Sequence, residues 1–166
     1  QAREVLTKVS ADDFSNAQFP YMTCREVEIG YVRVLAIRLT YVGELGWELH
    51  MPVEAVTHVY ATLVDAGREF DIANVGYRAI DSLRMEKRYL YWGADITPDY
   101  TPYEAGLGYC VALDKGSFMG SDALSRIKEE GVAERLCTFL IEAPVSVHGG
   151  ELISKNGRVL CISPHP

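Results

Sequence analysis

Large apolar side chains recur at every second position of residues 33–41, which is the pattern of a β-strand. One face would carry Leu35, Ile37, Leu39 and Tyr41, and the other Val34, Ala36, Arg38 and Thr40. Residues 42–46 follow with two glycines, which favour a tight turn because glycine adopts positive φ without strain. Residues 47–51 again place Trp47, Leu49 and Met51 on one side and are predicted to be the returning strand.

The segments on either side of this hairpin have equally local signals. Ser10 with the acidic residues after it predicts a short helix that ends at Pro20, and residues 24–29 predict a strand ended by Gly30. After Pro52 the apolar residues recur at the helical spacing i, i+3, i+4 and i+7, with Gly67 as the stop. A second helix, less regular in its apolar stripe, is predicted from about Val75 to Lys87.

The remainder of the chain reads differently, with loops and strands in the majority. Residues 95–102 predict a loop, and residues 121–130 predict a short polar helix capped by Ser121. Residues 134–142 alternate as a strand does, and Asn156-Gly157 between two apolar pairs predicts a hairpin. The order predicts an α+β fold up to about residue 115 and the opening of a small all-β unit after it.

Composition and charge exclude several functional classes. The 166 residues are 48% hydrophobic and 23% charged, as expected of a globular protein with one domain or little more. The net charge of −7 argues against a nucleic-acid binder, and the sequence has no apolar run long enough for a membrane span and no visible signal peptide. The chain starts at Gln1 and stops soon after a predicted strand, so we expect it to be part of a longer protein.

The cysteines and histidines show no metal-binding or disulfide pattern. Cys24, Cys110, Cys137 and Cys161 are far apart, and we expect buried or half-buried thiols in a reducing compartment. The four histidines lack ligand spacing, so no metal site is predicted. The sequence also lacks a Rossmann glycine fingerprint, a Walker A loop, a zinc-protease motif and a nucleophile elbow.

The first hairpin offers the clearest candidate chemistry. Its turn would bring Tyr41 near Glu48, and a carboxylate can hold an amidine-like ring edge through two parallel hydrogen bonds while an aromatic ring stacks on the heterocycle. A plain hairpin with Glu48 in solvent explains the same spacing. For the other charged residues, local ion pairs between Asp81 or Glu86 and nearby basic residues are expected, and Glu104 would cap or pair locally.

A family resemblance decides between these readings. The hairpin, with residues 76–87, 95–98, 101–107 and 115–120, strongly resembles the folate-binding aminomethyltransferase family, that of the glycine-cleavage T-protein. Within it, the phrases at residues 41–49 and 76–83 are most similar to the C-terminal folate domain of sarcosine and dimethylglycine dehydrogenases. The order and spacing of the blocks match over nearly the whole chain.

The resemblance implies roles for individual residues. Glu48 matches the glutamate that binds the pteridine, and Tyr41 the aromatic residue before it. The family's folate-contacting arginine falls at Ile80, with Arg78 the nearest arginine, so Arg78 is either a folate contact or a surface residue at a helix start. The acid credited with the proton chemistry would precede Gln1, so no catalytic residue is assigned here.

The implied fold has two parts. Residues 1–115 would form the central folate-binding α/β domain of the aminomethyltransferase type. Residues 116–166 would form a connecting helix and the start of a small C-terminal β-barrel. The implied location is the mitochondrial matrix in a eukaryote and the cytoplasm in a bacterium.

The implied activity is the capture of a one-carbon unit from sarcosine or dimethylglycine by tetrahydrofolate, giving 5,10-methylenetetrahydrofolate. FAD would be bound by a flavin dehydrogenase domain of the same full-length chain, so this stretch alone is expected to be inactive and to bind folate weakly. Two alternatives are a non-catalytic T-protein-like regulatory module and a glycine-cleavage aminomethyltransferase. Glu48 argues against the first, and Ile80 against the second.

Overall fold

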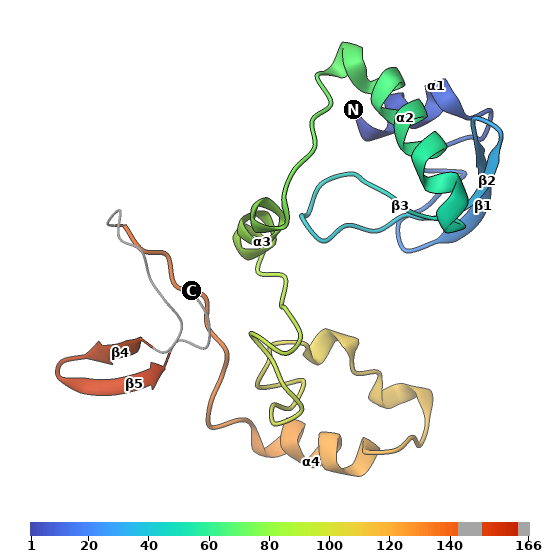
Figure 1. Ribbon diagram of the computed structural model, residues 1–166. Coiled ribbons are helices and arrows are strands. Elements are labelled where there is room, and N and C mark those ends of the chain that lie inside the picture. Colours follow the sequence, from blue (N-terminus) through green and yellow to red (C-terminus); the bar gives the residue numbers. More distant parts are fainter. Residues whose placement is uncertain (143–150, 163–166) are drawn as a thin grey trace. The chain divides into compact units, whose positions relative to one another are not determined.

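The computed structural model of the chain describes residues 1–142 and 151–162 (Figure 1). Its contacts divide it into two compact units, Gln1–Tyr89 and the part from Leu90 onward, which we describe separately. The first unit contains α1 (Ala2–Val9), β1 (Cys24–Ile29), β2 (Val32–Ile37), β3 (Glu48–His50), α2 (Val56–Gly67) and α3 (Tyr77–Glu86). The second contains α4 (Ser121–Glu130), β4 (Leu152–Lys155) and β5 (Arg158–Ile162). The mixed α and β composition agrees with the prediction, whereas the domain boundary at residue 115 stays a prediction.

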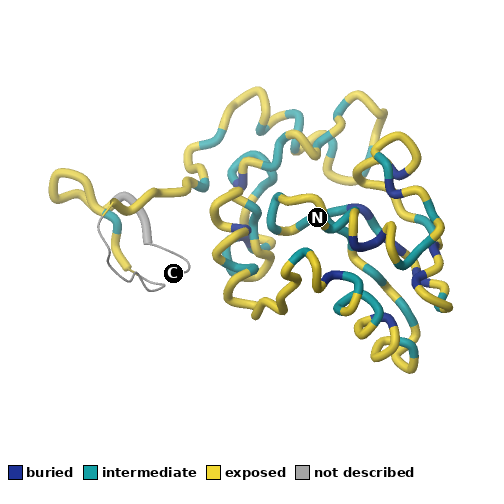
Figure 2. The backbone as a smooth tube through the Cα atoms, turned by 90° about the horizontal axis from the view of Figure 1, so that it is seen from above, coloured by how far each residue is buried: buried dark blue, intermediate teal, exposed yellow. Residues whose placement is uncertain are grey.

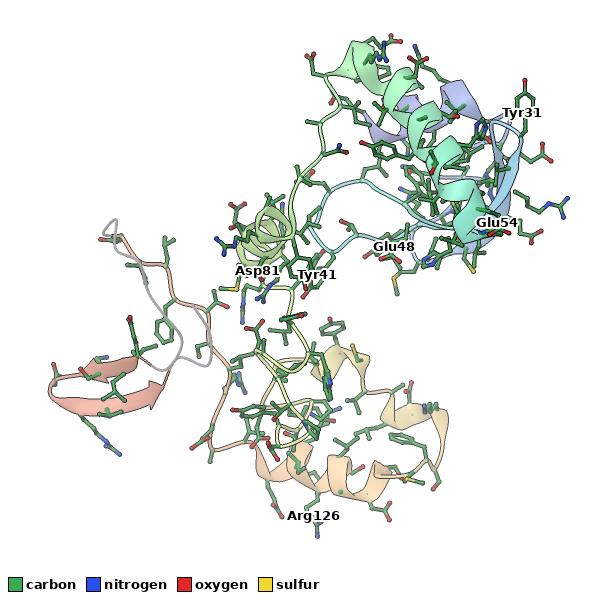
Figure 3. The ribbon with its side chains drawn as sticks, in the orientation of Figure 1. Tyr31, Tyr41, Glu48, Glu54, Asp81 and Arg126 are labelled. Carbon is green, nitrogen blue, oxygen red and sulfur yellow. The ribbon has the colours of Figure 1, made fainter. Side chains whose placement is uncertain are left out.

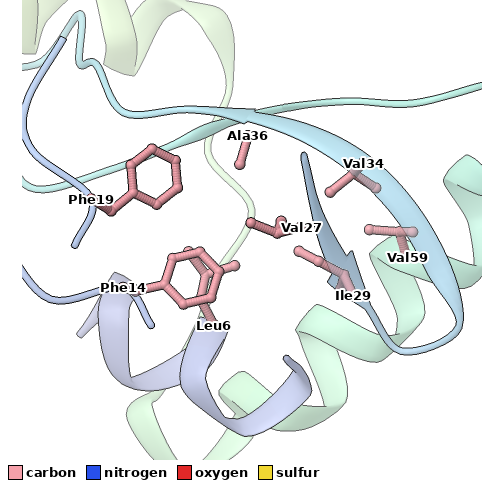
Figure 4. Packing of buried hydrophobic residues seen from close by; sticks show 8 residues of the cluster. All are labelled: Leu6, Phe14, Phe19, Val27, Ile29, Val34, Ala36 and Val59. Carbon is pink, nitrogen blue, oxygen red and sulfur yellow. The ribbon is translucent and has the colours of Figure 1, made fainter. Parts of the chain in front are cut away.

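The first unit is built on an antiparallel three-stranded sheet in the order β1-β2-β3. Alternation decides which face is buried: Val27 and Ile29 of β1 are at most 2% exposed, while the glutamates between and before them face outward. Most of the buried hydrophobic residues, coloured dark blue in Figure 2, belong to this unit. The core cluster, shown in Figure 4, consists of Leu6, Phe14, Phe19, Val27, Ile29, Val34, Ala36 and Val59.

Residues 10–20 contain no helix, so the helix predicted there is wrong, and the first helix is α1 instead. The acidic side chains that were predicted to begin this helix instead accept hydrogen bonds from the backbone N–H groups of other residues. Asp12 Oδ2 accepts the backbone N–H of Glu28 at 3.0 Å, and Asp13 Oδ1 accepts that of Ser15 at 2.7 Å. Such side-chain acceptors compete with helical hydrogen bonds and favour turns.

Arginine side chains hold this loop against the sheet. Arg38 is only 9% exposed; it donates to the carbonyl oxygen of Phe19 and, at 2.6 Å, to Asn16 Oδ1. Arg3 donates to the same Asn16 oxygen at 2.7 Å and to the carbonyl oxygen of Phe14 at 2.8 Å. Arg25 donates to the carbonyl oxygen of Asp13. Guanidinium groups from α1, β1 and the end of β2 thus hold this loop in place, although it forms no helix.

The strand predicted over residues 33–41 ends early, at Ile37. The backbone N–H of Leu39 bonds the carbonyl oxygen of Ile37 at 3.1 Å, which is the geometry of a γ-turn and stops the extended chain. The predicted tight turn is therefore replaced by a loop over residues 38–47, and the return strand is only β3.

The three helices after residue 52 are confirmed: α2, α3 and α4 lie where the sequence predicts them. The cap of α4 differs, because its N-cap residue is Gly120, in the left-handed region, rather than Ser121. Short 3₁₀ turns occur over Val53–Ala55, Arg68–Phe70, Gly108–Cys110 and Leu113–Lys115.

In the second unit one predicted hairpin forms and one predicted strand does not. Asn156 and Gly157, with φ of 53° and 76°, connect β4 and β5 as a type I′ turn requires. Residues 134–142 are irregular; Leu136 donates its N–H to the carbonyl oxygen of Glu104 at 2.9 Å, and the ladder that a strand needs is missing there. A two-stranded hairpin does not establish the start of a β-barrel, which stays a prediction.

The thiols also differ from expectation. Cys24, Cys110 and Cys137 are free and exposed, so their predicted burial is wrong, and the side chain of Cys161 lies outside the described residues. Cys24 is exposed because it projects from the outward side of β1. In the parts of the chain that are described, no helix combines the length and apolarity needed to cross a membrane.

Candidate functional site

The candidate site lies on the face of the sheet opposite the core, which we call the outer face. Its side chains are Cys24, Glu26 and Glu28 of β1, Arg33, Leu35 and Ile37 of β2, and Glu48 and His50 of β3. The register sets Ile37 opposite Glu48 and, in the next row, Leu35 opposite His50. Side chains directly opposite on antiparallel strands are close neighbours, so a carboxylate stands beside an apolar strip.

Glu48 is the best-placed of the predicted site residues. It opens β3, and its side chain is 52% exposed, with Oε2 lying 3.2 Å from Nε2 of His50. Leu49, between them, points to the core side and packs against the buried cluster. An ionised carboxylate can accept about four hydrogen bonds, so the contact with His50 leaves acceptor positions free for a ligand.

Tyr41 lies elsewhere in the loop and is not brought against Glu48, contrary to prediction. Its ring stacks on Tyr89, with centroids 6.3 Å apart and planes 16° apart. In Figure 3 Tyr41 is at the α3 end of the loop, whereas Glu48 is where the loop rejoins the sheet. The reason is the length of the 38–47 loop, whose tip is tied to the end of α3 by Lys87 Nζ and Glu44 Oε1 at 3.4 Å.

α3 carries two arginines with different roles. Arg78 is exposed in the first turn, and its binding role stays a prediction. Arg84 is 2% exposed; it pairs with Asp81 Oδ1 at 2.7 Å, as the local charge pattern predicts, and donates to the carbonyl oxygen of Tyr89 at 3.1 Å. Arg84 thereby fixes the residue on which Tyr41 stacks, a link that sequence spacing could not reveal.

Two hollows of this unit are lined by residues other than the predicted Tyr41, Glu48 and Arg78. One, of about 250 Å³, is lined by Ala2, Val5, Leu6, Trp47, Leu49, Leu63 and Ile72. The other, of about 440 Å³, is lined by Ala11, Asp12, Glu26, Val27, Glu28 and Arg33. Tyr41, Glu48 and Arg78 line neither hollow, whereas Glu26, Glu28 and Arg33 of the outer face line the second one. Nowhere in residues 1–142 or 151–162 are three or more His, Cys, Asp or Glu side chains grouped to hold a metal ion.

Glu104 proves to be a capping residue. Its Oε2 accepts both the N–H and the hydroxyl of Thr101 at 2.7 Å, and its own N–H donates to Thr101 Oγ1 at 3.3 Å. This is the reciprocal arrangement of a capping box. The backbone N–H of Thr101, and then its hydroxyl, lower the pKa of Glu104 because they stabilise the ionised carboxylate.

The lowered pKa of Glu104 predicts a contribution to folding stability that depends on pH. That contribution is present above the pKa of the unfolded chain and is lost as the pH falls through the folded pKa. We expect Glu104→Gln to be less stable than the parent near neutral pH and the difference to shrink by about pH 3. Thermal unfolding followed by circular dichroism at both pH values measures it, with Glu129→Gln on α4 as the control. A difference that is constant with pH would contradict the capping role of the charge.

Comparisons with known proteins come from sequence and from structure. The family described as GCVT N-terminal domain matches residues 1–115. The mitochondrial sarcosine dehydrogenase of Mus musculus is 42% identical over 160 residues, which are 96% of this chain and 17% of that protein. The mitochondrial dimethylglycine dehydrogenase of Homo sapiens is 40% identical over 162 residues, 96% of this chain and 19% of that protein.

A solved structure has the same fold. The glycine cleavage system aminomethyltransferase T from Bartonella henselae superposes with a TM-score of 0.65 and 29% sequence identity, covering 79% of this chain and 35% of that one. The chain thus spans less than a fifth of the two dehydrogenases and about a third of the structural relative.

Proposed function

Since the chain belongs to the GCVT N-terminal domain family, we propose that it is part of a folate-binding domain in a larger dehydrogenase of N-methylated glycines. Sequence identity of 40–42% to the sarcosine and dimethylglycine dehydrogenases, against 36% to the aminomethyltransferase of Caldanaerobacter subterraneus, favours this branch over the glycine-cleavage one by a small margin. Within the longer protein, FAD would supply the oxidation of the N-methyl group and tetrahydrofolate would serve as the acceptor of the one-carbon unit, so that the products would be the demethylated amine and 5,10-methylenetetrahydrofolate.

The observation that carries this proposal is the position of Glu48 on the outer face. A pterin ring presents an amino group and a ring N–H along one edge, and both are donors that a carboxylate accepts in parallel. Glu48 offers free acceptor positions, and Ile37 opposite it offers an apolar surface for the flat ring. The residues present therefore fit the pteridine end of a reduced folate.

Other residues would contribute at greater distance. Tyr41 stacks on Tyr89 and would have to leave that contact to cover the ring of a pterin bound at Glu48. Arg78, exposed on α3, would meet a negatively charged part of the folate. Displacing water around the one-carbon unit would prevent its loss as formaldehyde.

The wider setting follows from the same proposal. A flavin dehydrogenase domain of the same chain would supply the oxidised methyl group, and residues 116–166 would form a connecting helix and the start of a C-terminal β-barrel. The mitochondrial relatives favour the mitochondrial matrix if the source is eukaryotic. The alternative, a regulatory module without folate binding, predicts that neither the parent chain nor its Glu48 variant binds tetrahydrofolate in the experiment below.

Replacing Glu48 tests the proposal. We expect the chain to bind tetrahydrofolate weakly, and Glu48→Gln to weaken that binding about tenfold, because the amide loses the charge and one of the two acceptors. Isothermal titration calorimetry measures both affinities. Glu54→Gln is the matched control, since Glu54 is exposed beside the sheet but lies outside the outer face (Figure 3). Equal affinities of the parent and Glu48→Gln, or an absence of binding in both, would contradict the proposal.

A further inference from the structure

His50 contacts the proposed pterin-binding carboxylate. It lies two residues after Glu48 on β3, so both side chains project from the outer face. The imidazole Nε2 is 3.2 Å from Glu48 Oε2, and the His50 side chain is 55% exposed. Leu35 stands opposite His50 in the register. The ring is therefore next to Glu48 and to the apolar strip beside it.

The other basic side chain of the outer face pairs with a different carboxylate. Arg33, the basic side chain of β2, lies 3.6 Å from Glu26 of β1. Glu26 shares the cross-strand row of Leu35 and His50, and Cys24 shares that of Ile37 and Glu48. Among these neighbours His50 is the group with a ring nitrogen facing Glu48 Oε2, to which it donates in the tautomer that carries the proton on Nε2.

A ring that donates to one carboxylate oxygen changes what Glu48 can do. A glutamate on a surface strand samples many rotamers, and binding a flat ligand in two parallel hydrogen bonds requires one of them. A donor at Oε2 restricts that rotation while leaving the remaining lone pairs of both oxygens for the ligand.

We propose that His50 is a positioning residue that holds the Glu48 carboxylate in the orientation that binds the pterin edge of a reduced folate. This inference rests on the proposed function. It assigns to His50 an effect on affinity that acts through Glu48 and involves no contact of His50 with the folate.

A double-mutant cycle with tetrahydrofolate measures that effect on the whole chain. We expect His50→Phe, which keeps a ring and removes the donor, to weaken binding about threefold to tenfold. His50→Gln keeps a donor N–H and is expected to bind within about twofold of the parent. In a Glu48→Gln background, His50→Phe should have no further effect. His58→Phe, on the exposed side of α2, is the control and should bind as the parent does.

Two results of the cycle would overturn the inference. Parent-like binding by His50→Phe would show that the contact does not orient Glu48. An equal loss in both backgrounds would show that His50 acts on the ligand independently of Glu48.

A second measurement separates this inference from the proposed function. Long-range ¹H–¹⁵N spectra of the histidine rings, recorded without folate, should show a change at Nε2 of His50 between the parent and Glu48→Gln. Unchanged spectra would overturn the inference even if folate binds. A changed spectrum in a chain that binds no folate would support the pair and contradict the proposed function.

Discussion

Replacing Phe14 by alanine is expected to lower the free energy of unfolding of the first unit by about 3–5 kcal/mol, the usual cost of deleting a buried aromatic ring. Phe14 is 2% exposed and lies in an irregular loop, so this cost comes from side-chain packing and not from a helix or strand. Its ring stacks on Phe19 at 5.9 Å and meets Trp47 edge-on at 5.5 Å. Urea denaturation followed by tryptophan fluorescence measures the change.

Two further variants define the result for Phe14. Phe14→Leu fills most of the volume and should cost less than the alanine variant. Tyr31→Ala removes an aromatic ring that is 95% exposed (Figure 3) and should change stability by no more than about 0.5 kcal/mol. A loss below about 1 kcal/mol in Phe14→Ala would contradict the packing role assigned to the loop.

This aromatic cluster connects stability with the candidate site. Trp47, whose ring meets both Phe14 and Phe19 edge-on, is the residue before Glu48 and fixes where β3 begins. Because side chains alternate along a strand, an anchored Trp47 and Leu49 on the core side put Glu48 on the outer face. The core thus decides which way the proposed ligand-binding carboxylate points.

Periodicity predicted the elements whose signal is local. The apolar spacing after Pro52 and the Asn156-Gly157 turn need only neighbouring residues to form, and both are confirmed. The short strand over 134–142 needed a partner that alternation cannot supply, and the stretch is irregular. In the same way, the helix predicted before Pro20 does not form, because its residues make hydrogen bonds with distant parts of the unit, such as that from Glu28 N–H to Asp12.

The candidate site was predictable up to the loop. Alternation is enough to place Glu48 and His50 on one face, and the two-residue spacing was the available signal for their contact. It could not place Tyr41, because the path of residues 38–47 depends on Lys87 and Tyr89 at the far end of α3. Alternation also could not tell which face of β2 is buried. The buried face carries Val34 and Ala36 and continues to Arg38, whereas Leu35 on the other face is 39% exposed. That outward apolar strip is what the proposed site uses.

The buried end of β2 gives the second large effect. We expect Arg38→Met to lower the free energy of unfolding by about 2–4 kcal/mol, although methionine packs well, because the carbonyl oxygen of Phe19 and Asn16 Oδ1 lose a charged donor. Arg38→Lys should restore little of it, since an ammonium lacks the fork that reaches both acceptors and the flat group that lies 5.6 Å over the Trp47 ring. Urea denaturation measures both variants. Arg33→Met, which breaks an ion pair with both partners about two-thirds exposed, should cost no more than about 1 kcal/mol. Equal losses in Arg38→Met and Arg33→Met would show that the loop of residues 10–20 holds its place, and with it Trp47 and the start of β3, without Arg38.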